Sequence, residues 1–582
     1  MSNYMETYKQ WCTDPYFDAD TKAELKKIEG DQAEIEDRFY RQLEFGTGGL
    51  RGVIGAGTNR MNIYTVRQAT QGLANYIISQ NGQEKGVAIA HDSRIMSPEF
   101  TEEAALCLNA NGIKAYVFDS LRPTPELSFA VRELGCISGI VITASHNPRE
   151  YNGYKVYGED GAQMSPESTD KVVEFIDKTP YFGICEENAD ITADNVKGLD
   201  NVLVAPHITV IGKSVDNAYF DTISKLSLSP AAVEKFGKNV KIVYTPIHGS
   251  GYIPVTTILS RMGITVNVVK EQALPDTEFS TVRVPNPEEA DTLRLGVKLA
   301  DEIGSDVVIG TDPDADRMGI AIRDDNGKFV LLNGNQIGVL LADYIFRRKT
   351  EENTMPQNGA LVKTIVTTEL ARKVATSYGV TTFDVLTGFK FIGEKIKEWE
   401  ENGKYTYLFG FEESYGYLAG SYVRDKDAVV ASMLICEMAA FYRSQGISLV
   451  QARAKMYSDY GFYCNKLDTF TFEGETGMKK MNAIMDTLRN EKLEAVAGLK
   501  VIGKADYKLS VKTDYESGKT EELTLPKSNV ITFYLEDNAS VVIRPSGTEP
   551  KIKLYYTTVG TSVEDAAEKQ VKLSADFTKI VG

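Results

Sequence analysis

The stretch SDVVIGTDPDADRMGIAI, residues 305–322, decides the fold class that we assign to this chain. Its first six residues form an apolar run with β-branched valine and isoleucine, which is typical of a strand buried on both faces. Runs of the same kind precede polar loops at residues 86–90, 138–143 and 241–244. Because amphipathic stretches separate these strands, the pattern predicts an α/β fold with mainly parallel sheets covered by helices on both faces.

The length of the chain predicts its number of domains, and its net charge disfavours some classes of binding partner. With 582 residues, and about 150 residues per domain, the chain is expected to contain about four domains. Its 64 basic and 81 acidic side chains give a formal net charge of −17. General nucleic-acid and anionic-membrane binders need a basic surface, so neither partner is expected, and no obligate protein partner is inferred. An anionic ligand would require positive charge concentrated in its site.

The cysteines and histidines exclude several metal centres. Six cysteines are scattered along the chain without a CxxC pair, so neither a disulfide framework nor a zinc ribbon is expected. We interpret them as free thiols in a reducing compartment. Only four histidines occur, which argues against a histidine-rich metal centre. The sequence contains no recognisable secretion signal or membrane span, and we therefore expect a cytoplasmic protein.

Three aspartates follow the first strand of the opening stretch. Asp312, Asp314 and Asp316 repel one another unless a cation neutralises them, and an all-oxygen ligand set suits Mg²⁺. An EF-hand begins similarly, but it needs glycine and glutamate where this chain has Arg317 and Arg323. The other alternative is a solvated acidic turn. The flanking apolar strands and the adjacent arginine favour a metal site.

Ser145 lies in TASHNP, residues 143–148, at the end of another apolar strand. A serine hydrolase would need GxSxG, which is absent here. Adjacent residues of an extended chain point to opposite sides, so His146 is not expected to act as a base for this serine. A phosphorylated serine would carry a charge of about −1.5 to −2, and its oxygens would complete the Mg²⁺ coordination. The alternative is a turn serine that caps Asn147 and Pro148.

Four further loops carry groups suited to sugar phosphates. FGTGGLRG at 45–52 is flexible and contains one cation, Arg51, but it matches neither a Walker A loop nor a dinucleotide fingerprint. RPSGTEPKIK at 544–553 combines an arginine, two hydroxyls and a glycine, as in a phosphate-binding loop. TGFKFIGEKI at 387–396 and FGFEESYGYLAGSYVRDKDA at 409–428 offer hydrogen-bonding groups for sugar hydroxyls. Taken singly, each is equally typical of an ordinary surface loop.

The motifs TASHNP, DPDADR, EES and RPSGTEP occur in this order across essentially the whole chain. In this respect the chain resembles the α-D-phosphohexomutases, in particular the branch of phosphoglucomutases and phosphopentomutases with FEESYGY. The resemblance implies four domains around a central cleft, with three related mixed α/β domains and a smaller C-terminal α+β domain. The expected domains are 1–205 with the phosphoserine loop, 206–325 with the Mg-binding loop, 326–458 with the sugar-binding loop and 459–582 with the phosphate-binding loop.

The resemblance also implies a role for each motif residue. The phosphoserine would be Ser145, and the Mg²⁺ ligands would be Ser145, Asp312, Asp314 and Asp316. The cations around the transferring phosphoryl group would be Arg51, Lys155 and Arg317. The sugar would contact Thr387, Lys390, Lys426, Glu412 and Ser414, the last two through its 3- and 4-hydroxyls. The phosphate that does not react would be held by Arg544, Ser546, Gly547 and Thr548.

The implied activity is that of a phosphoglucomutase, which interconverts glucose 1-phosphate and glucose 6-phosphate through glucose 1,6-bisphosphate. Phosphopentomutases, phosphomannomutases and sugar-bisphosphate synthases are alternatives within the family. Gly416 and Tyr417 stand where dual-specificity bacterial members have a histidine, which disfavours a phosphomannomutase. A metal-dependent phosphatase would need clustered histidine and aspartate ligands for two metals. An inactive sugar-phosphate sensor should have lost Ser145 or an aspartate.

The charge of the implied site makes the three cations necessary. Three carboxylates and one phosphate sum to about −5, and Mg²⁺ returns +2, which leaves about −3 before a second phosphate approaches. We therefore expect Arg51, Lys155 and Arg317 to be functional. Lys155 is also a candidate general acid or base, although the surrounding anions oppose the lowered pKa that this role requires.

Overall fold

The computed structural model describes residues 4–46, 48–180, 205–472, 474–546 and 550–582. The chain divides into two compact units. The first consists of residues 1–334, 392–410 and 414–446, and the second of residues 335–391, 411–413 and 447–582. Among the helices of the described ranges, none is long and apolar enough to cross a membrane.

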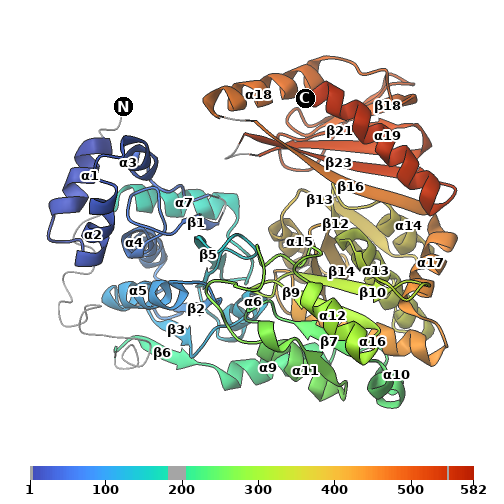
Figure 1. The fold of residues 1–582 in the computed structure, drawn as a ribbon, viewed down its shortest axis with the longest axis horizontal. Coiled ribbons are helices and arrows are strands. Elements are labelled where there is room, and N and C mark those ends of the chain that lie inside the picture. Colours follow the sequence, from blue (N-terminus) through green and yellow to red (C-terminus); the bar gives the residue numbers. More distant parts are fainter. Residues whose placement is uncertain (1–3, 47, 181–204, 473, 547–549) are drawn as a thin grey trace. The chain divides into compact units, whose positions relative to one another are not determined.

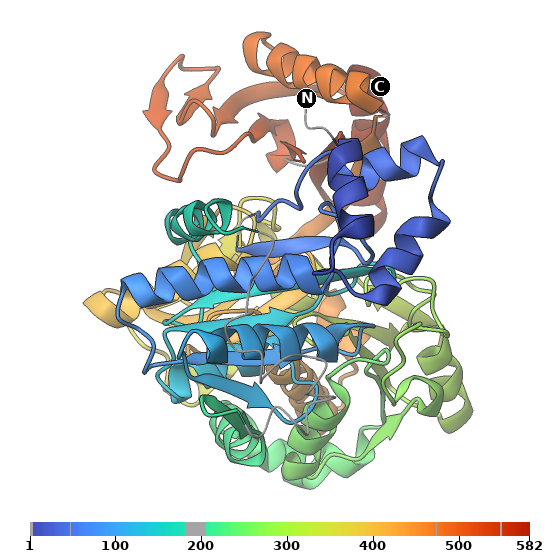
Figure 2. The same cartoon turned by 90° about the vertical axis from the view of Figure 1, so that its left-hand side faces the viewer.

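Three short helices open the first unit, namely α1 (Tyr4–Thr13), α2 (Ala19–Lys27) and α3 (Gln32–Phe39). Asp18 caps α2 by accepting a hydrogen bond from the Thr21 amide. The Trp11 ring stacks on Phe17 at 4.2 Å and meets Tyr64 edge to face at 5.5 Å. Figure 2 shows these helices (dark blue) gathered at one end of α4 (Ile63–Ser79), where Tyr64 lies. They therefore share an aromatic core with Tyr64 of α4.

The first sheet contains strands in the order β1-β5-β4-β2-β3-β6. Their bounds are Gly49–Val53 (β1), Val87–His91 (β2), Ala115–Phe118 (β3), Ser138–Ile142 (β4), Tyr151–Gly158 (β5) and Ile208–Ile211 (β6). The neighbours β4, β2, β3 and β6 run parallel, whereas β5 pairs antiparallel with both β4 and β1. The sheet packs against α4, α5 (Ser97–Ala110), α6 (Thr124–Glu133) and α7 (Pro166–Asp177).

Both faces of β2 and β4 are buried, as the apolar runs predict. Ile89 and Ile140 join a core that contains side chains from α4, α5 and α7. Gly139 points to the opposite face, because successive residues of a strand alternate in direction. A Cβ at Gly139 would lie 2.5 Å from Cγ2 of Val131, so glycine lets α6 approach the sheet closely.

The second sheet of the first unit has the order β11-β10-β9-β7-β8. Its strands are Ile242–Thr245 (β7), Val266–Val268 (β8), Val307–Thr311 (β9), Met318–Arg323 (β10) and Phe329–Leu332 (β11). The helices of this region are α9 (Lys213–Ser224), α10 (Pro230–Phe236), α11 (Tyr252–Met262), α12 (Arg294–Ile303), α16 (Ala428–Ser444) and the short 3₁₀ turns η2 (Gly237–Asn239) and η3 (Lys270–Gln272). The four strands expected from the apolar runs are confirmed to within two residues.

The expectation of mainly parallel sheets is wrong in detail, because both sheets of the first unit are mixed. The β4–β5 and β9–β10 pairs are antiparallel neighbours joined by residues 143–150 and 312–317. A parallel connection needs a crossover of about a dozen residues or more, so loops this short join antiparallel strands. These two hairpin loops carry Ser145 and the three aspartates.

In the second unit, β12 (Gly359–Thr364) and β13 (Thr381–Val385) pair in parallel. The accompanying helices are α13 (Gly334–Glu351), α14 (Leu370–Ser377) and α17 (Leu449–Tyr460). The chain passes from one unit to the other in the region of α15 (Phe389–Asn402), β14 (Thr406–Glu412) and β15 (Gly416–Ala419).

The C-terminal sheet has the order β16-β23-β22-β21-β18-β19-β20, with β17 paired to β18. Its elements are β16 (Phe462–Thr471), α18 (Gly474–Asn490), β17 (Ala495–Val496), β18 (Leu499–Asp506), β19 (Val511–Asp514), β20 (Thr520–Glu522), β21 (Ile531–Leu535), η4 (Glu536–Asn538), β22 (Ser540–Pro545), β23 (Lys551–Gly560) and α19 (Val563–Val581). The pairs are antiparallel, as the alternating sequence predicts. Side chains of α18 and α19 share a core with the sheet, and Figure 1 shows both helices along it.

Candidate active site

Ser145 and the three aspartates come together in the first unit. The Ser145 hydroxyl donates a hydrogen bond of 2.7 Å to Asp312 Oδ2, although 167 residues separate the two in the chain. Ser145 is only 3% exposed, and its φ of 51° lies in the left-handed region. The two hairpin loops thus place the expected phosphoserine directly on the acidic loop.

The acidic loop has the donor set of a metal site. Asp312, Asp314 and Asp316 are fully buried, and each offers a carboxylate oxygen within 4.8 Å of the others. Oδ1 of Asp314 and Oδ1 of Asp316 are buried and accept no hydrogen bond in the described part of the chain, whereas Asp316 Oδ2 lies near two lysine ammonium groups. Burying unpartnered carboxylate oxygens is costly, and a hard divalent cation relieves that cost. The residues present therefore fit a divalent metal ion.

Cations surround these carboxylates. Lys155 Nζ lies 2.8 Å from Asp314 Oδ2 and 3.5 Å from Asp316 Oδ2. Lys426 Nζ lies 2.9 Å from Asp316 Oδ2, which places this residue in the acidic centre as well. Arg317 Nε lies 3.7 Å from Asp316 Oδ1. The local positive charge that an anionic ligand requires is therefore present.

These charges shift two pKa values. Burial, together with the neighbouring Asp314 and Asp316, raises the pKa of Asp312 well above its ordinary value. Burial disfavours the charged form of Lys155, but Asp314 and Asp316 outweigh this effect and raise the pKa of Lys155. The ammonium therefore stays protonated at neutral pH, which argues against Lys155 as a general base.

Arg51 lies at the edge of the Ser145 loop. It belongs to β1 and pairs in register with Gly153 of β5, which follows that loop. Its Nη1 donates a hydrogen bond of 3.4 Å to Asn147 Oδ1, and the side chain is exposed. The guanidinium can therefore contact an anion that approaches Ser145.

His146 lies closer to Ser145 than the sequence predicts. Extended chain would point the two side chains apart, but the positive φ of Ser145 turns the backbone. As a result, Nδ1 of His146 lies 3.2 Å from the Ser145 Oγ. Burial, followed by the charges of Arg317 and Arg51, lowers the pKa of His146 well below its ordinary value. The imidazole is therefore neutral, and its surroundings disfavour its protonation.

Glu412 connects two of the expected sugar-binding loops in the second unit. Its Oε1 accepts a hydrogen bond of 2.8 Å from the Gly388 amide, and the side chain is 7% exposed. Thr387 and Lys390 flank this glycine, and both are partly exposed. Ser414, which is also partly exposed, follows in the sequence and belongs to the first unit.

Glu413 is a second carboxyl group beside Glu412, and it is partly buried. Its Oε2 accepts hydrogen bonds from the hydroxyls of Thr364 and Thr367, at 3.2 and 3.3 Å. Burial, reinforced by the charge of Glu412, raises the pKa of Glu413 to about 7. The carboxyl group is therefore poised between its neutral and charged forms near neutral pH.

The expected phosphate loop begins at the end of β22. Arg544 lies beside Tyr555 of β23 and is partly exposed. The Ser546 amide donates a hydrogen bond of 2.7 Å to the Lys551 carbonyl, which closes the base of the loop. The two other residues expected to bind phosphate lie outside the described residues: Gly547 and Thr548.

Family matches cover most of the chain. Residues 42–181, 217–327 and 333–460 match the alpha/beta/alpha domains I, II and III of phosphoglucomutase/phosphomannomutase, and residues 481–572 match its C-terminal domain. The chain belongs to the phosphoglucomutase/phosphomannomutase family. This membership confirms the resemblance drawn from the four motifs and the α/β fold class.

Individual relatives align with this family member over nearly their whole length. A phosphoglucomutase of Staphylococcus saprophyticus is 38% identical over 534 residues, which covers 91% of the chain and 93% of that protein. A phosphoglucomutase of Staphylococcus aureus is 36% identical over 548 residues, which covers 94% of the chain and 95% of that protein. Two solved structures share the fold. Parafusin from Paramecium has a TM-score of 0.65 at 18% identity, and the match covers 93% of this chain and 95% of that one. A phosphoglucomutase/phosphomannomutase family protein from Burkholderia thailandensis has a TM-score of 0.64 at 17% identity, and the match covers 93% of this chain and 98% of that one.

The residue that holds the Ser145 loop in place is Arg94, which belongs to none of the four phosphoglucomutase/phosphomannomutase motifs. Arg94 is 1% exposed, and its Nε lies 3.3 Å from Asp92 Oδ2. Its guanidinium donates hydrogen bonds to four backbone carbonyls of the loop, those of Ser145, Asn147, Pro148 and Tyr151. The only signal in the sequence is HDSR, residues 91–94, which follows a predicted strand.

Thr124 supports the acidic loop in a similar way. Its amide donates to the Asp314 carbonyl and its hydroxyl donates to Asp314 Oδ2, both at 2.9 Å. The two residues are 190 positions apart, so no local pattern links them. With Oδ2 held by Thr124 and Lys155, the other oxygen of Asp314 is left for a metal ion.

Proposed function

We propose that this member of the phosphoglucomutase/phosphomannomutase family is a phosphoglucomutase, an isomerase that interconverts glucose 1-phosphate and glucose 6-phosphate. The Ser145–Asp312 hydrogen bond carries the proposal, because it places a phosphorylatable hydroxyl on the acidic loop. The staphylococcal relatives, named phosphoglucomutase and 36–38% identical over 91–94% of the chain, favour this activity over the pentose and mannose alternatives.

In the proposed reaction, phosphorylated Ser145 gives its phosphoryl group to the free hydroxyl of a sugar monophosphate. The bond between phosphorus and the serine oxygen breaks, a bond to the sugar oxygen forms, and the proton of the sugar hydroxyl ends on the serine oxygen, which becomes the free Ser145 hydroxyl. The product is glucose 1,6-bisphosphate, which turns over in the site. Its other phosphoryl group then returns to Ser145: the bond between phosphorus and that sugar oxygen breaks, a bond to the serine oxygen forms, and the serine proton ends on the departing sugar oxygen. Phosphoryl transfer depends chiefly on positioning and charge stabilisation.

The residues around Ser145 divide these tasks. Arg51, Lys155 and Arg317 neutralise the transferring phosphoryl group, and the raised pKa of Lys155 keeps it cationic.

A divalent ion would be held by Asp312, Asp314, Asp316 and an oxygen of phosphorylated Ser145. We propose Mg²⁺, because the donors are oxygen atoms only. When bound, the ion stabilises negative charge on the transferring phosphoryl group. The unpartnered oxygens of Asp314 and Asp316 support this assignment.

The remaining roles follow the family motifs. We propose that the sugar contacts Thr387, Lys390, Glu412, Ser414 and Lys426, and that the second phosphate contacts Arg544, Ser546, Gly547 and Thr548. The proposed domains are residues 1–205, 206–325, 326–458 and 459–582. Free thiols support a reducing compartment such as the cytoplasm, and the described free cysteines are Cys12, Cys107, Cys136, Cys436 and Cys464.

Mass spectrometry and a substrate comparison test the proposal. Incubation with glucose 1,6-bisphosphate should add one phosphoryl group to wild type and none to Ser145→Ala. The kcat/KM for glucose 1-phosphate should exceed those for mannose 1-phosphate and ribose 1-phosphate. Wild-type turnover by Ser145→Ala would overturn the mechanism, and a preference for ribose 1-phosphate would make the enzyme a phosphopentomutase.

A further inference from the structure

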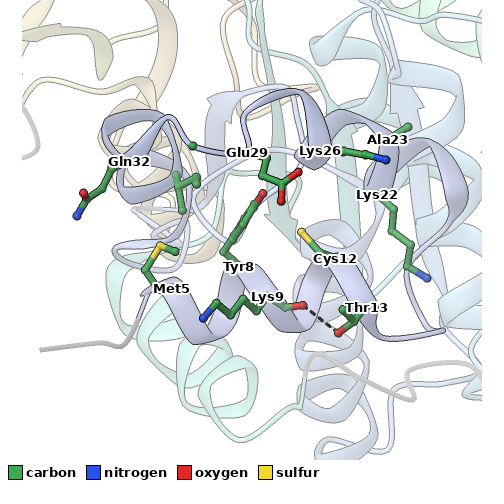
Figure 3. A pocket seen from close by; sticks show the side chains of 12 residues that line it. Met5, Tyr8, Lys9, Cys12, Thr13, Lys22, Ala23, Lys26, Glu29 and Gln32 are labelled. Carbon is green, nitrogen blue, oxygen red and sulfur yellow. Dashed lines mark hydrogen bonds between the residues drawn. The ribbon is translucent and has the colours of Figure 1, made fainter.

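A cavity lies between the three N-terminal helices of the first unit. Its volume of about 750 Å³ is within the range of small-molecule sites. Residues of α1, α2 and α3 line it (Figure 3). The family match begins at residue 42, so this cavity belongs to a part of the chain outside the four matched domains. Sugar-phosphate chemistry therefore does not account for it.

The inner wall of the cavity is apolar and fixed. Tyr8 and Ile35 line it and are 7% and 2% exposed. The Tyr8 hydroxyl donates a hydrogen bond of 3.1 Å to the Leu25 carbonyl, so the ring is the part that remains for a ligand. That ring packs edge to face on Phe39 at 5.8 Å. The cavity is thus preformed beside a complete aromatic core.

The rim of the cavity is positive. Lys9, Lys22 and Lys26 line it together with a single acidic residue, Glu29, so the lining residues carry three positive charges and one negative charge. Within the residues that the structure describes, none of the three ammonium groups has an ion-pair partner. On a chain with a net charge of −17, this rim is a local reversal of sign. Figure 3 shows Tyr8 and Cys12 extending from α1 toward Glu29.

We propose that this cavity binds a small amphipathic anion, with an aromatic or aliphatic body and a single negative group. The body packs on the Tyr8 ring and Ile35, and the negative group pairs with Lys22 or Lys26, which lie about one helical turn apart on α2. The proposal goes beyond the mutase reaction and does not depend on it.

The charge requirement is tested with 8-anilinonaphthalene-1-sulfonate, an aromatic monoanion, by fluorescence titration of the full-length protein. The Lys22→Glu/Lys26→Glu variant should bind it about tenfold more weakly than wild type, because two attractive charges become repulsive. Lys27→Glu is the control: it reverses one lysine charge on α2 at a position that does not line the cavity, and should change affinity less than about twofold. Equal weakening by both variants would overturn the proposal.

Cys12 reports occupancy at the site itself, since its side chain lines the cavity and is partly exposed. Saturating 8-anilinonaphthalene-1-sulfonate should slow N-ethylmaleimide addition to Cys12 at least threefold in wild type, measured by peptide mass spectrometry. The neutral analogue N-phenyl-1-naphthylamine should bind wild type and the double variant alike. An unchanged rate at Cys12 while the probe binds would place the probe elsewhere and reject the proposal. Mutase activity, measured in parallel, should stay unchanged in the lysine variants.

Discussion

The acidic loop, which the family motifs assign to phosphoryl transfer, and the Glu412 loop, which they assign to sugar binding, are stabilised by different kinds of contact. In the acidic loop of the first unit, Asp314 and Asp316 meet lysine ammonium groups at 2.8 and 2.9 Å. In the second unit, Glu412 and Glu413 meet a backbone amide and two threonine hydroxyls. Formal charges balance the first loop, whereas neutral dipoles hold the second. We therefore expect charge reversal to reduce turnover in the first and to change substrate binding or stability in the second.

The largest effect is expected from Lys155→Glu. It removes the partner of Asp314 and adds a fourth carboxylate, so kcat should fall by about 1000-fold or more. Lys390→Glu makes the same charge change near the sugar loop and should cost about tenfold, mainly in KM. Thermal unfolding of both variants checks that they are folded. Near-normal turnover of a folded Lys155→Glu protein would remove the distinction between the two loops.

Arg94→Lys tests whether the Ser145 loop must be held rigidly. Lysine keeps the charge beside Asp92 but cannot bond all four loop carbonyls, so kcat should fall about 100-fold through misplacement of the serine. Arg67→Lys is the control, because Arg67 makes a two-point contact with Glu103 away from this loop. Its stability should fall without loss of kcat. Equal losses of kcat in the two variants would show a general packing defect instead.

Thr124→Val should act on metal affinity. Valine matches threonine in size but leaves Asp314 Oδ2 with Lys155 as its remaining side-chain donor. The Mg²⁺ concentration for half-maximal activity should rise about tenfold, with kcat recovered at saturating metal. Thr101→Val, at a buried threonine that bonds the Ser97 carbonyl, should leave this concentration unchanged. The assignment fails if the two variants have the same Mg²⁺ dependence.

The smallest effect concerns Glu413 and the pH dependence of stability. Its pKa is raised from 4.5 to about 7 in the folded protein, so its stabilising contribution is present at low pH and is lost as pH rises from 4.5 through 7. Glu413→Gln remains neutral, and its Tm relative to wild type should therefore be higher at pH 8 than at pH 5 by about 2 °C or more. Glu401→Gln, at an exposed position of α15, should show no such trend. An equal Tm difference at both pH values would exclude a raised pKa.

The sequence predicts the local parts of the site better than its long-range support. Apolar runs place four strands, and the spacing of Asp312, Asp314 and Asp316 puts three carboxylates in one loop. The direction of β5 and β10 is not predicted, because a short hairpin loop joins each of them antiparallel to the preceding strand. The contact between Thr124 and Asp314 joins residues 190 positions apart, and no periodicity encodes such a pair. The position of the His146 side chain is mispredicted for a local reason, since the prediction assumes an extended backbone that Ser145 does not adopt.

The backbone of Ser145 also has a consequence for how this position can evolve. A φ of 51° costs a residue with a side chain about 1 kcal/mol, whereas glycine adopts it freely. Replacement by glycine would remove this backbone strain, but the protein would then have no hydroxyl to phosphorylate at this position. At this position, selection for low backbone strain therefore favours glycine, whereas selection for catalytic turnover favours serine.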